Sequence, residues 1–314
     1  MIIALHTIQM PLYNNFFTFG YLHMPQRAAT SMFFLISSYF FWVSINSSQN
    51  VYKTFIKHIT RWLTCYAFWS FLHLRFYYFD WFYATYGVLW FLYALIIGNI
   101  IVFLTTRIID NKYFYLFSAV ALSLFMSLAD AWYNCAVNLP IIGKIITVYY
   151  NIFVSMLSPF TMGIVFSVVA YLLAGLISNR SPNKISVKKH CGIAALFLTL
   201  FAVEGYYTCM HGFPKHYTFF FSTMPLCVSV FTLILKINIK VPYARCLGKL
   251  SALLYYIHIL FYYYWVNTYS PVYEAYPEST KDFHTFFYTF ICASWVSFII
   301  YLLSKKVPIL KSLF

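Results

Sequence analysis

Long apolar runs without charge alternate with short polar segments along most of the chain. A helix rises 1.5 Å per residue, so about 20 apolar residues cross a hydrocarbon core of about 30 Å. Nine runs approach or exceed this length, and charged residues, proline or asparagine bound each of them. We therefore predict nine full transmembrane helices, over residues 28–46, 62–79, 87–106, 113–130, 151–177, 190–208, 217–235, 247–267 and 285–303.

Residues 1–13 are predicted to be the end of a further helix that precedes these nine. Thirteen residues reach about 20 Å, about two-thirds of the hydrocarbon core, and no basic residue comes before them. We therefore expect a truncated first helix, which either begins in a thinned part of the bilayer or continues upstream for about ten residues or more. The predicted fold class is all-α, a polytopic membrane helix bundle of ten helices, with residues 1–314 forming a single integral membrane domain.

The composition agrees with a chain that is surrounded mainly by lipid. Hydrophobic residues make up 62% of the 314 positions, aromatic residues 23% and charged residues only 9%, which excludes a soluble globular protein. The formal net charge of +14 would be compatible with a nucleic-acid-binding protein. However, the basic residues form short clusters between the apolar runs, so we expect membrane lipid as a partner and no nucleic acid.

The basic residues also predict which loops are cytoplasmic. Sixteen of the 21 Lys and Arg residues fall on alternate loops, and such an excess is typical of the cytoplasmic side. The opposite loops and the span ends leading to them hold the other five basic residues and most of the acidic ones. We therefore predict a cytoplasmic C-terminus, with the basic loops within residues 53–61, 107–112, 180–189 and 236–249 and the tail 305–311 on the inner side.

A few ionisable side chains lie within or beside the predicted spans, where such groups are costly and often functional. His6 lies in the outer half of the first helix among aliphatic residues that offer no partner. A neutral imidazole there could act as a general base, although a structural role is the alternative. Asp130 and Glu204 lie at outer helix ends, where a solvated carboxylate costs little, but either could line a cavity, orient a histidine or bind a sugar.

Ser251, Tyr255 and His258 follow one another at spacings of four and three residues, which places them on one helical face. They could line a common cavity, or they could form a polar stripe that hydrogen-bonds neighbouring helices. No metal site is predicted, because Cys209, His211 and a histidine at position 216 have unsuitable spacing and no fourth ligand nearby. The seven scattered cysteines form no CxxC pair and are interpreted as packing residues.

Five short motifs follow one another along nearly the whole chain. They are His6 in the first helix, FFLISSYF at 33–40, KHITR at 57–61 before Tyr66 and Trp69, LWFL at 89–92, and GKLS at 248–251 before Tyr255 and His258. Taken together in this order, they resemble the signatures of the membrane-bound acyltransferase-3 family. That family includes O-acetyltransferases that modify surface polysaccharides.

The resemblance implies a ten-helix protein of the bacterial inner membrane that takes an acyl group from cytoplasmic acyl-CoA. Acetyl is the commoner group in the family, and the acceptor would be a hydroxyl of an extracytoplasmic surface polysaccharide or lipid-linked glycan. Acyl-CoA is then a co-substrate, and no bound cofactor or metal is implied. The resemblance makes His6 the catalytic base, Arg61, Ser37, Ser38 and Tyr39 candidates for contact with acyl-CoA or the oxyanion, and Trp90, Ser251, Tyr255, His258, Glu204 and Asp130 candidates for lining the cavity.

The chain departs from the family pattern in its first helix. The family carries an Arg eleven residues before the histidine, and here that position would precede Met1, in agreement with the truncated first helix. Ser38 and Cys65 stand where the family usually has Gly and often has Pro. Two alternatives remain open: a multipass transporter or flippase of a sugar or small solute, and an inactive homologue.

Overall fold

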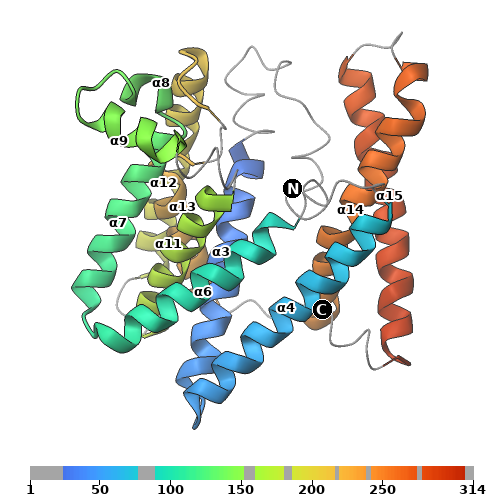
Figure 1. Cartoon of the computed structure of the whole chain (residues 1–314), viewed down its shortest axis with the longest axis horizontal. Helices are drawn as coiled ribbons and strands as arrows, with labels where there is room; N and C mark the ends of the chain where they lie inside the picture. The colour runs from blue at the N-terminus through green and yellow to red at the C-terminus, as the bar shows by residue number, and fades with distance from the viewer. Residues whose placement is uncertain are drawn as a thin grey trace. The chain divides into compact units, whose positions relative to one another are not determined.

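The computed structural model describes residues 24–76, 89–151, 160–179, 186–215, 219–237, 242–273 and 278–307 (Figure 1). Within these ranges the regular elements are all helical. The helices are α3 (Met24–Asn46), α4 (Val51–Phe76), α6 (Trp90–Ile108), α7 (Lys112–Ala129), α8 (Tyr133–Ala136), α9 (Ile142–Tyr149), α11 (Phe160–Ser178), α12 (Val187–Met210), α13 (Thr223–Ile237), α14 (Ala244–Tyr273) and α15 (Glu278–Ser304).

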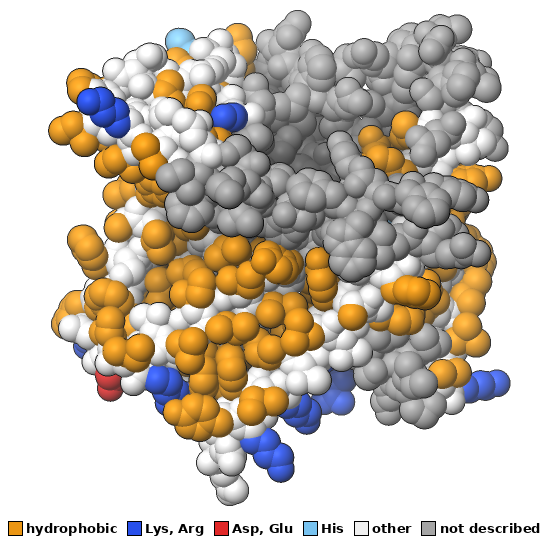
Figure 2. Space-filling view, viewed as in Figure 1, with side chains coloured by type: hydrophobic (Ala, Val, Ile, Leu, Met, Phe, Trp, Pro, Cys, Tyr) orange, Lys and Arg blue, Asp and Glu red, His pale blue; other side chains and the backbone are white. Residues whose placement is uncertain are grey.

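Six of the described helices are long and apolar enough to cross a membrane, namely α3, α6, α7, α12, α14 and α15. The apolar parts of α11 and α13 are shorter. On the described part of the face in Figure 2, apolar side chains predominate and Lys and Arg side chains are few. The predicted all-α, multipass fold class is therefore confirmed, and the count of ten helices stays a prediction because residues 1–23 lie outside the described ranges.

Some boundaries differ from the predicted ones. α4 begins at Val51, so Lys53, Lys57 and Arg61 lie on a helix and not in a loop. The three cations are four residues apart and all exposed, which gives this part of α4 one charged face. Asn50 Oδ1 accepts a hydrogen bond from the Lys53 backbone N–H at 2.9 Å and so caps the first turn.

The polar segment after α7 is also more regular than expected. Two short helices, α8 and α9, occupy most of residues 133–149, where the sequence predicted a loop. Helix α11 begins at Phe160, whereas the sequence placed the start of this span at residue 151. Apolar composition alone therefore marked the spans but not the points where their helices begin.

The chain divides into two compact units, and the division falls within α4. Among the described residues, unit 1 comprises 59–76, 89, 242–273 and 278–307, and unit 2 comprises 24–58, 90–151, 160–179, 186–215 and 219–237. The predicted organisation as a single membrane domain stays a prediction.

In unit 2, α11 is the central helix and contacts α3, α6, α7 and α13. Close approach of α6 and α11 depends on Gly98, because a Cβ there would lie 2.2 Å from Ser167 Oγ. Such small residues let membrane helices pack closely where lipid provides no hydrophobic drive between them. Helix α13 packs on α12 and α3, which completes the unit.

In unit 1, α14 and α15 pack along each other, and the rings of Trp265 and Tyr288 stack at 4.1 Å between centroids. The part of α4 in this unit is joined to α14 by His73, whose Nε2 lies 3.0 Å from the carbonyl oxygen of Tyr256. Trp69 stacks on the Tyr256 ring at 5.0 Å. His73 is fully buried, so its contact with α14 is a structural one.

Candidate functional site

His6, the predicted general base, lies outside the described residues, so its catalytic role stays a prediction. The other predicted residues are described and fall into the two units. Unit 2 holds Ser37, Ser38, Tyr39, Trp90, Asp130 and Glu204, and unit 1 holds Arg61, Ser251, Tyr255 and His258.

The α3 candidates lie on a packed helix. Ser38 is fully buried, and its hydroxyl donates a hydrogen bond to the Phe34 carbonyl one turn earlier at 2.7 Å. The Tyr39 ring packs edge-on against Phe231 of α13, with centroids 5.1 Å apart. Ser37 is half-buried. The three side chains therefore point in different directions around α3 and do not form one cluster.

Trp90, at the start of α6, packs between α3 and α11. Its ring centroid lies 6.0 Å from that of Phe34, and a Cβ at Gly163 would come within 2.7 Å of the indole. The glycine is therefore needed to accommodate the indole, which gives Trp90 a packing role in addition to its predicted place on a cavity.

In unit 1 the predicted face of α14 is only partly buried. His258 is 1% exposed, and its Nδ1 lies 3.0 Å from the Leu254 carbonyl oxygen of the preceding turn. The Tyr255 ring lies 6.1 Å from the His258 ring, whereas Ser251 is exposed. Arg61 of α4 is exposed too. Tyr255 and His258 thus lie close to each other, whereas Ser251 is exposed at the helix surface.

Glu204, near the end of α12, is held by four hydrogen bonds. Its Oε1 accepts from Trp132 Nε1 at 2.9 Å and from the Phe221 backbone N–H at 2.8 Å. Its Oε2 accepts from the backbone N–H and the hydroxyl of Ser222, at 3.0 and 2.5 Å. The carboxylate therefore fixes the segment that leads into α13.

Asp130 has a similar role at the end of α7. It is fully buried, its Oδ2 accepts from the Phe219 backbone N–H at 2.7 Å, and its carbonyl oxygen accepts from the Lys215 backbone N–H at 3.0 Å. Burial, and after it the negative charge of Asp130, raises the pKa of Tyr149 to about 12 and raises that of Tyr150 as well. Both phenols therefore stay protonated at neutral pH, and Tyr150 donates to the Ala129 carbonyl at 2.6 Å.

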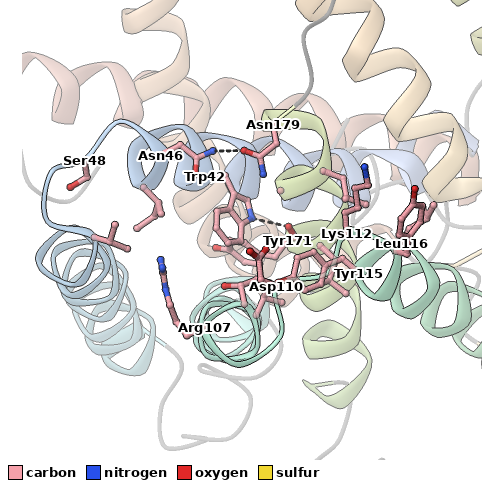
Figure 3. Close-up of a pocket in the computed structure, with 18 residues that line it drawn as sticks. Trp42, Asn46, Ser48, Arg107, Asp110, Lys112, Tyr115, Leu116, Tyr171 and Asn179 are labelled. Atoms are coloured by element: carbon pink, nitrogen blue, oxygen red, sulfur yellow. Dashed lines mark hydrogen bonds between the residues drawn. The ribbon is translucent and has the colours of Figure 1, made fainter.

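A pocket of about 680 Å³ lies in unit 2 at the beginning of α7, the opposite end of this helix from Asp130 (Figure 3). It is bounded by the ends of α3, α6 and α11 and by the beginnings of α4 and α7. Three charged residues line it, together with amide, hydroxyl and aromatic side chains. The polar and aromatic lining residues are Trp42, Asn46, Ser48, Thr106, Arg107, Asp110, Lys112, Tyr113, Tyr115, Tyr171 and Asn179.

Hydrogen bonds shape the wall of this pocket. Trp42 Nε1 donates to the Tyr171 carbonyl at 2.8 Å, and Asn46 Nδ2 donates to Asn179 Oδ1 at 3.1 Å, which ties α3 to α11 (Figure 3). A Cβ at Gly175 would lie 3.1 Å from the Trp42 indole nitrogen, so the glycine leaves room for this ring. The wall is therefore fixed by contacts within unit 2 alone.

Arg107 extends from the end of α6 toward α4. Its guanidinium carbon lies 4.8 Å from the Phe103 ring centroid and 5.9 Å from that of Tyr52. These cation–π contacts orient the side chain without using its N–H donors. Arg107 is exposed, and among the described residues it forms no ion pair.

None of the predicted site residues that the structure describes lines this pocket. From the sequence alone, Arg107 and Lys112 indicate only a cytoplasmic loop. The sequence did contain one indication of the pocket. Its lining includes residues within 46–51, 107–116 and 175–179, and all three segments lie at or next to loops predicted to be cytoplasmic. Within the described residues no group of three or more His, Cys, Asp or Glu side chains could hold a metal ion.

Comparison with known families gives a clear result. The model of the acyltransferase-3 family, described as an acyltransferase domain, matches residues 1–304. The chain belongs to this family. The acyltransferase is thus a multipass membrane protein, and the resemblance predicted from five motifs is confirmed. Neither the curated proteins nor the solved structures include a match to this acyltransferase.

Proposed function

We propose that this acyltransferase moves an acyl group, with acetyl as the favoured one, from acyl-CoA in the cytoplasm to a hydroxyl of an extracytoplasmic glycan. The observation that carries the proposal is the family match over residues 1–304. The acceptor is a surface polysaccharide or a lipid-linked glycan, and the product is an O-acyl ester. The protein lies in a bacterial inner membrane with its C-terminus in the cytoplasm.

In the proposed reaction His6 takes the proton of the acceptor hydroxyl as that oxygen attacks the thioester carbonyl. The tetrahedral intermediate collapses, its C–S bond breaks, and CoA leaves as a thiolate that takes up a proton. The developing oxyanion needs a donor. Ser37, Ser38, Tyr39 and Arg61 are the candidates, and the Ser38 hydroxyl hydrogen is already directed at the Phe34 carbonyl. This contact favours Ser37, Tyr39 and Arg61 over Ser38 as the donor to the oxyanion.

The charge pattern supports a donor that arrives from the inner side. The pocket in unit 2 lies where loops predicted to be cytoplasmic meet, and Arg107 and Lys112 line it. Acyl-CoA is polyanionic, and cations near a membrane surface raise the local concentration of such a ligand. The opposite ends of α7 and α12 carry Asp130 and Glu204, as expected for the outer side.

The test is incorporation of labelled acetate, which cells convert to acetyl-CoA, into the glycan fraction of cells that express the full-length protein. His6→Ala is expected to abolish transfer while expression and membrane insertion persist, because no other group would take the hydroxyl proton. His190→Ala, a histidine on the first turn of α12, is the matched control and should retain activity. Normal acetylation in His6→Ala would contradict the role of His6, and solute uptake without acyl-CoA would favour a transporter.

A further inference from the structure

The pocket in unit 2 has the properties of a small-molecule site. Its volume of about 680 Å³ is within the range of about 300–1,000 Å³ that is usual for ligand pockets. Apolar residues such as Val102, Leu172 and Leu176 line it together with a few polar side chains. Ligand sites commonly combine an apolar wall with a small number of polar groups in this way.

The charged residues of the pocket favour an anion. Arg107 and Lys112 are cationic and Asp110 is anionic, so the lining carries one net positive charge. All three are exposed, and no ion pair among the described residues joins them. The guanidinium of Arg107 is held by the Phe103 and Tyr52 rings, so its N–H groups can meet the oxygens of a phosphate in a fixed orientation.

The helix ends at the pocket do not decide whether a ligand should be an anion or a cation. Helices α4 and α7 begin there and direct N–H groups at it, whereas α3, α6 and α11 end there and direct carbonyl groups. The side chains of Asn111 and Asn50 already accept hydrogen bonds from the first turns of α7 and α4. The preference for an anion therefore comes from Arg107 and Lys112.

The inner wall of the pocket includes the buried side chain of Tyr171. Tyr171 is 1% exposed, and its hydroxyl has no hydrogen bond of good geometry in the described part of the chain. Asn99 and Ser38, which are fully buried and do not line the pocket, lie close enough to this hydroxyl to interact with it. The phenol hydroxyl is therefore directed at buried groups of the helix bundle, and Tyr171 offers a ligand in the pocket the surface of its ring.

We propose that this pocket binds an organic phosphate, with the phosphate at Arg107 and Lys112 and the rest of the molecule against the wall formed by Trp42 and Tyr171. Two molecules of the inner membrane face carry this chemistry: the phosphorylated nucleotide of CoA and the headgroup of an anionic phospholipid. Binding of CoA here would rest on the proposed function. Binding of phospholipid would not.

The experiment measures binding to the purified full-length protein in nanodiscs of zwitterionic lipid, without turnover. In one arm CoA is titrated by calorimetry, and in the other phosphatidylglycerol is added and counted by native mass spectrometry. The double variant Arg107→Gln/Lys112→Gln is expected to weaken the ligand by about tenfold or more, since each exposed charge contributes up to about fivefold. Lys53→Gln, an exposed cation of α4 that does not line the pocket, is the matched control.

Asp110→Asn gives a test of opposite sign. It removes the one carboxylate of the pocket and is expected to tighten the same ligand by about twofold, and high salt should reduce both effects. A merely structural role of these side chains would not produce opposite changes. This variant also keeps the proposal testable if the double variant does not fold.

Each outcome decides the proposal. Weaker CoA binding in the double variant assigns the pocket to the nucleotide, and weaker phosphatidylglycerol binding with unchanged CoA assigns it to the headgroup. If neither ligand responds to the double variant or to Asp110→Asn, the pocket is not a phosphate site. Because the assay requires no acyl transfer, it tests phosphate binding even if the proposed function is wrong.

Discussion

The two ends of unit 2 use polar residues in opposite ways. At the end formed by α7, α12 and the start of α13, Asp130 and Glu204 accept hydrogen bonds from backbone N–H groups and fix the connecting segment. At the other end, Arg107 and Lys112 stand exposed around a pocket and form no ion pair within the described residues. The first arrangement stabilises the fold, and the second leaves charge available to a ligand.

The role of a charged side chain at a helix end therefore depends on the partners of its charged group. A carboxylate that satisfies several donors cannot be removed without leaving those donors unpaired. An exposed cation beside a cavity can be removed with little effect on folding. The two ends should therefore respond differently to substitution, and four predictions test this difference.

The largest effect is expected at Glu204. Glu204→Ala would leave Trp132 Nε1 and the backbone N–H groups of Phe221 and Ser222 without their acceptor, at a cost of about 1–3 kcal/mol per unpaired group and about 3 kcal/mol or more in total. Glu204→Gln keeps one acceptor oxygen and should lose less. Thermal unfolding in detergent, followed by tryptophan fluorescence, measures both, with exposed Asn138→Ala as control. A Glu204→Ala protein as stable as wild type would remove the distinction between the two ends.

The next largest effect on stability is expected where α6 and α11 pack, at Gly98. Gly98→Ala would place a methyl group 2.2 Å from Ser167 Oγ and force α6 and α11 apart, at a cost of about 1–3 kcal/mol. Ser167→Gly in the same protein should restore part of this loss, because it removes the side chain that clashes. A double-mutant cycle of unfolding free energies gives the coupling. Additive effects would mean that the two residues do not meet.

A smaller effect is expected from Asp130→Asn. The folded-state pKa of Tyr149 and that of Tyr150 lie above the usual value of 10, so their contribution to stability is complete below pH 10 and is lost at higher pH, for Tyr149 as the pH rises through about 12. Loss of the Asp130 charge should lower both phenol pKa values. Absorbance titration at alkaline pH checks this, and burial, the larger cause, should keep the values above 10. An unchanged titration curve would show that Asp130 does not act on the phenols.

The smallest effect on stability is expected at the pocket. Arg107→Gln and Lys112→Gln should each change the free energy of unfolding by about 0.5 kcal/mol or less, because both side chains are exposed. The same unfolding assay measures this change beside that of Glu204→Ala. A loss at Arg107 or Lys112 as large as that at Glu204 would mean that these cations hold the helices together.

Much of the fold could be predicted from sequence because lipid imposes simple rules on chain length and polarity. The apolar runs at 28–46, 113–130 and 285–303 correspond closely to the apolar parts of α3, α7 and α15 that are long enough to cross a membrane, Ala28–Asn46, Lys112–Ala129 and Phe283–Ser304. The start of α4 could not be predicted in this way, since Lys53, Lys57 and Arg61 read as a loop although their spacing of four residues suits an exposed helical face. Apolar content predicts which segments cross the bilayer, but it does not predict where their helices begin.

The candidate site was less predictable, for a physical reason. The motifs identified the family, but a motif does not specify which side chains meet in space. The sequence indicates that Asp130 and Glu204 lie at helix ends, but only the structure reveals that their carboxylates accept hydrogen bonds from backbone N–H groups within residues 219–222. The pocket joins the ends of five helices, and that convergence cannot be read from separate segments of sequence.

The most direct test of acyl transfer across the membrane uses vesicles of known orientation. Acetyl-CoA does not cross a lipid bilayer, so labelled acetyl-CoA is added outside either inverted or right-side-out vesicles that contain the full-length protein and its glycan acceptor. We expect labelled O-acetyl ester in inverted vesicles, whose exposed face is the cytoplasmic one, and none in right-side-out vesicles. Ester formation in right-side-out vesicles, or in neither preparation, would contradict an acyltransferase that draws its donor from the cytoplasm.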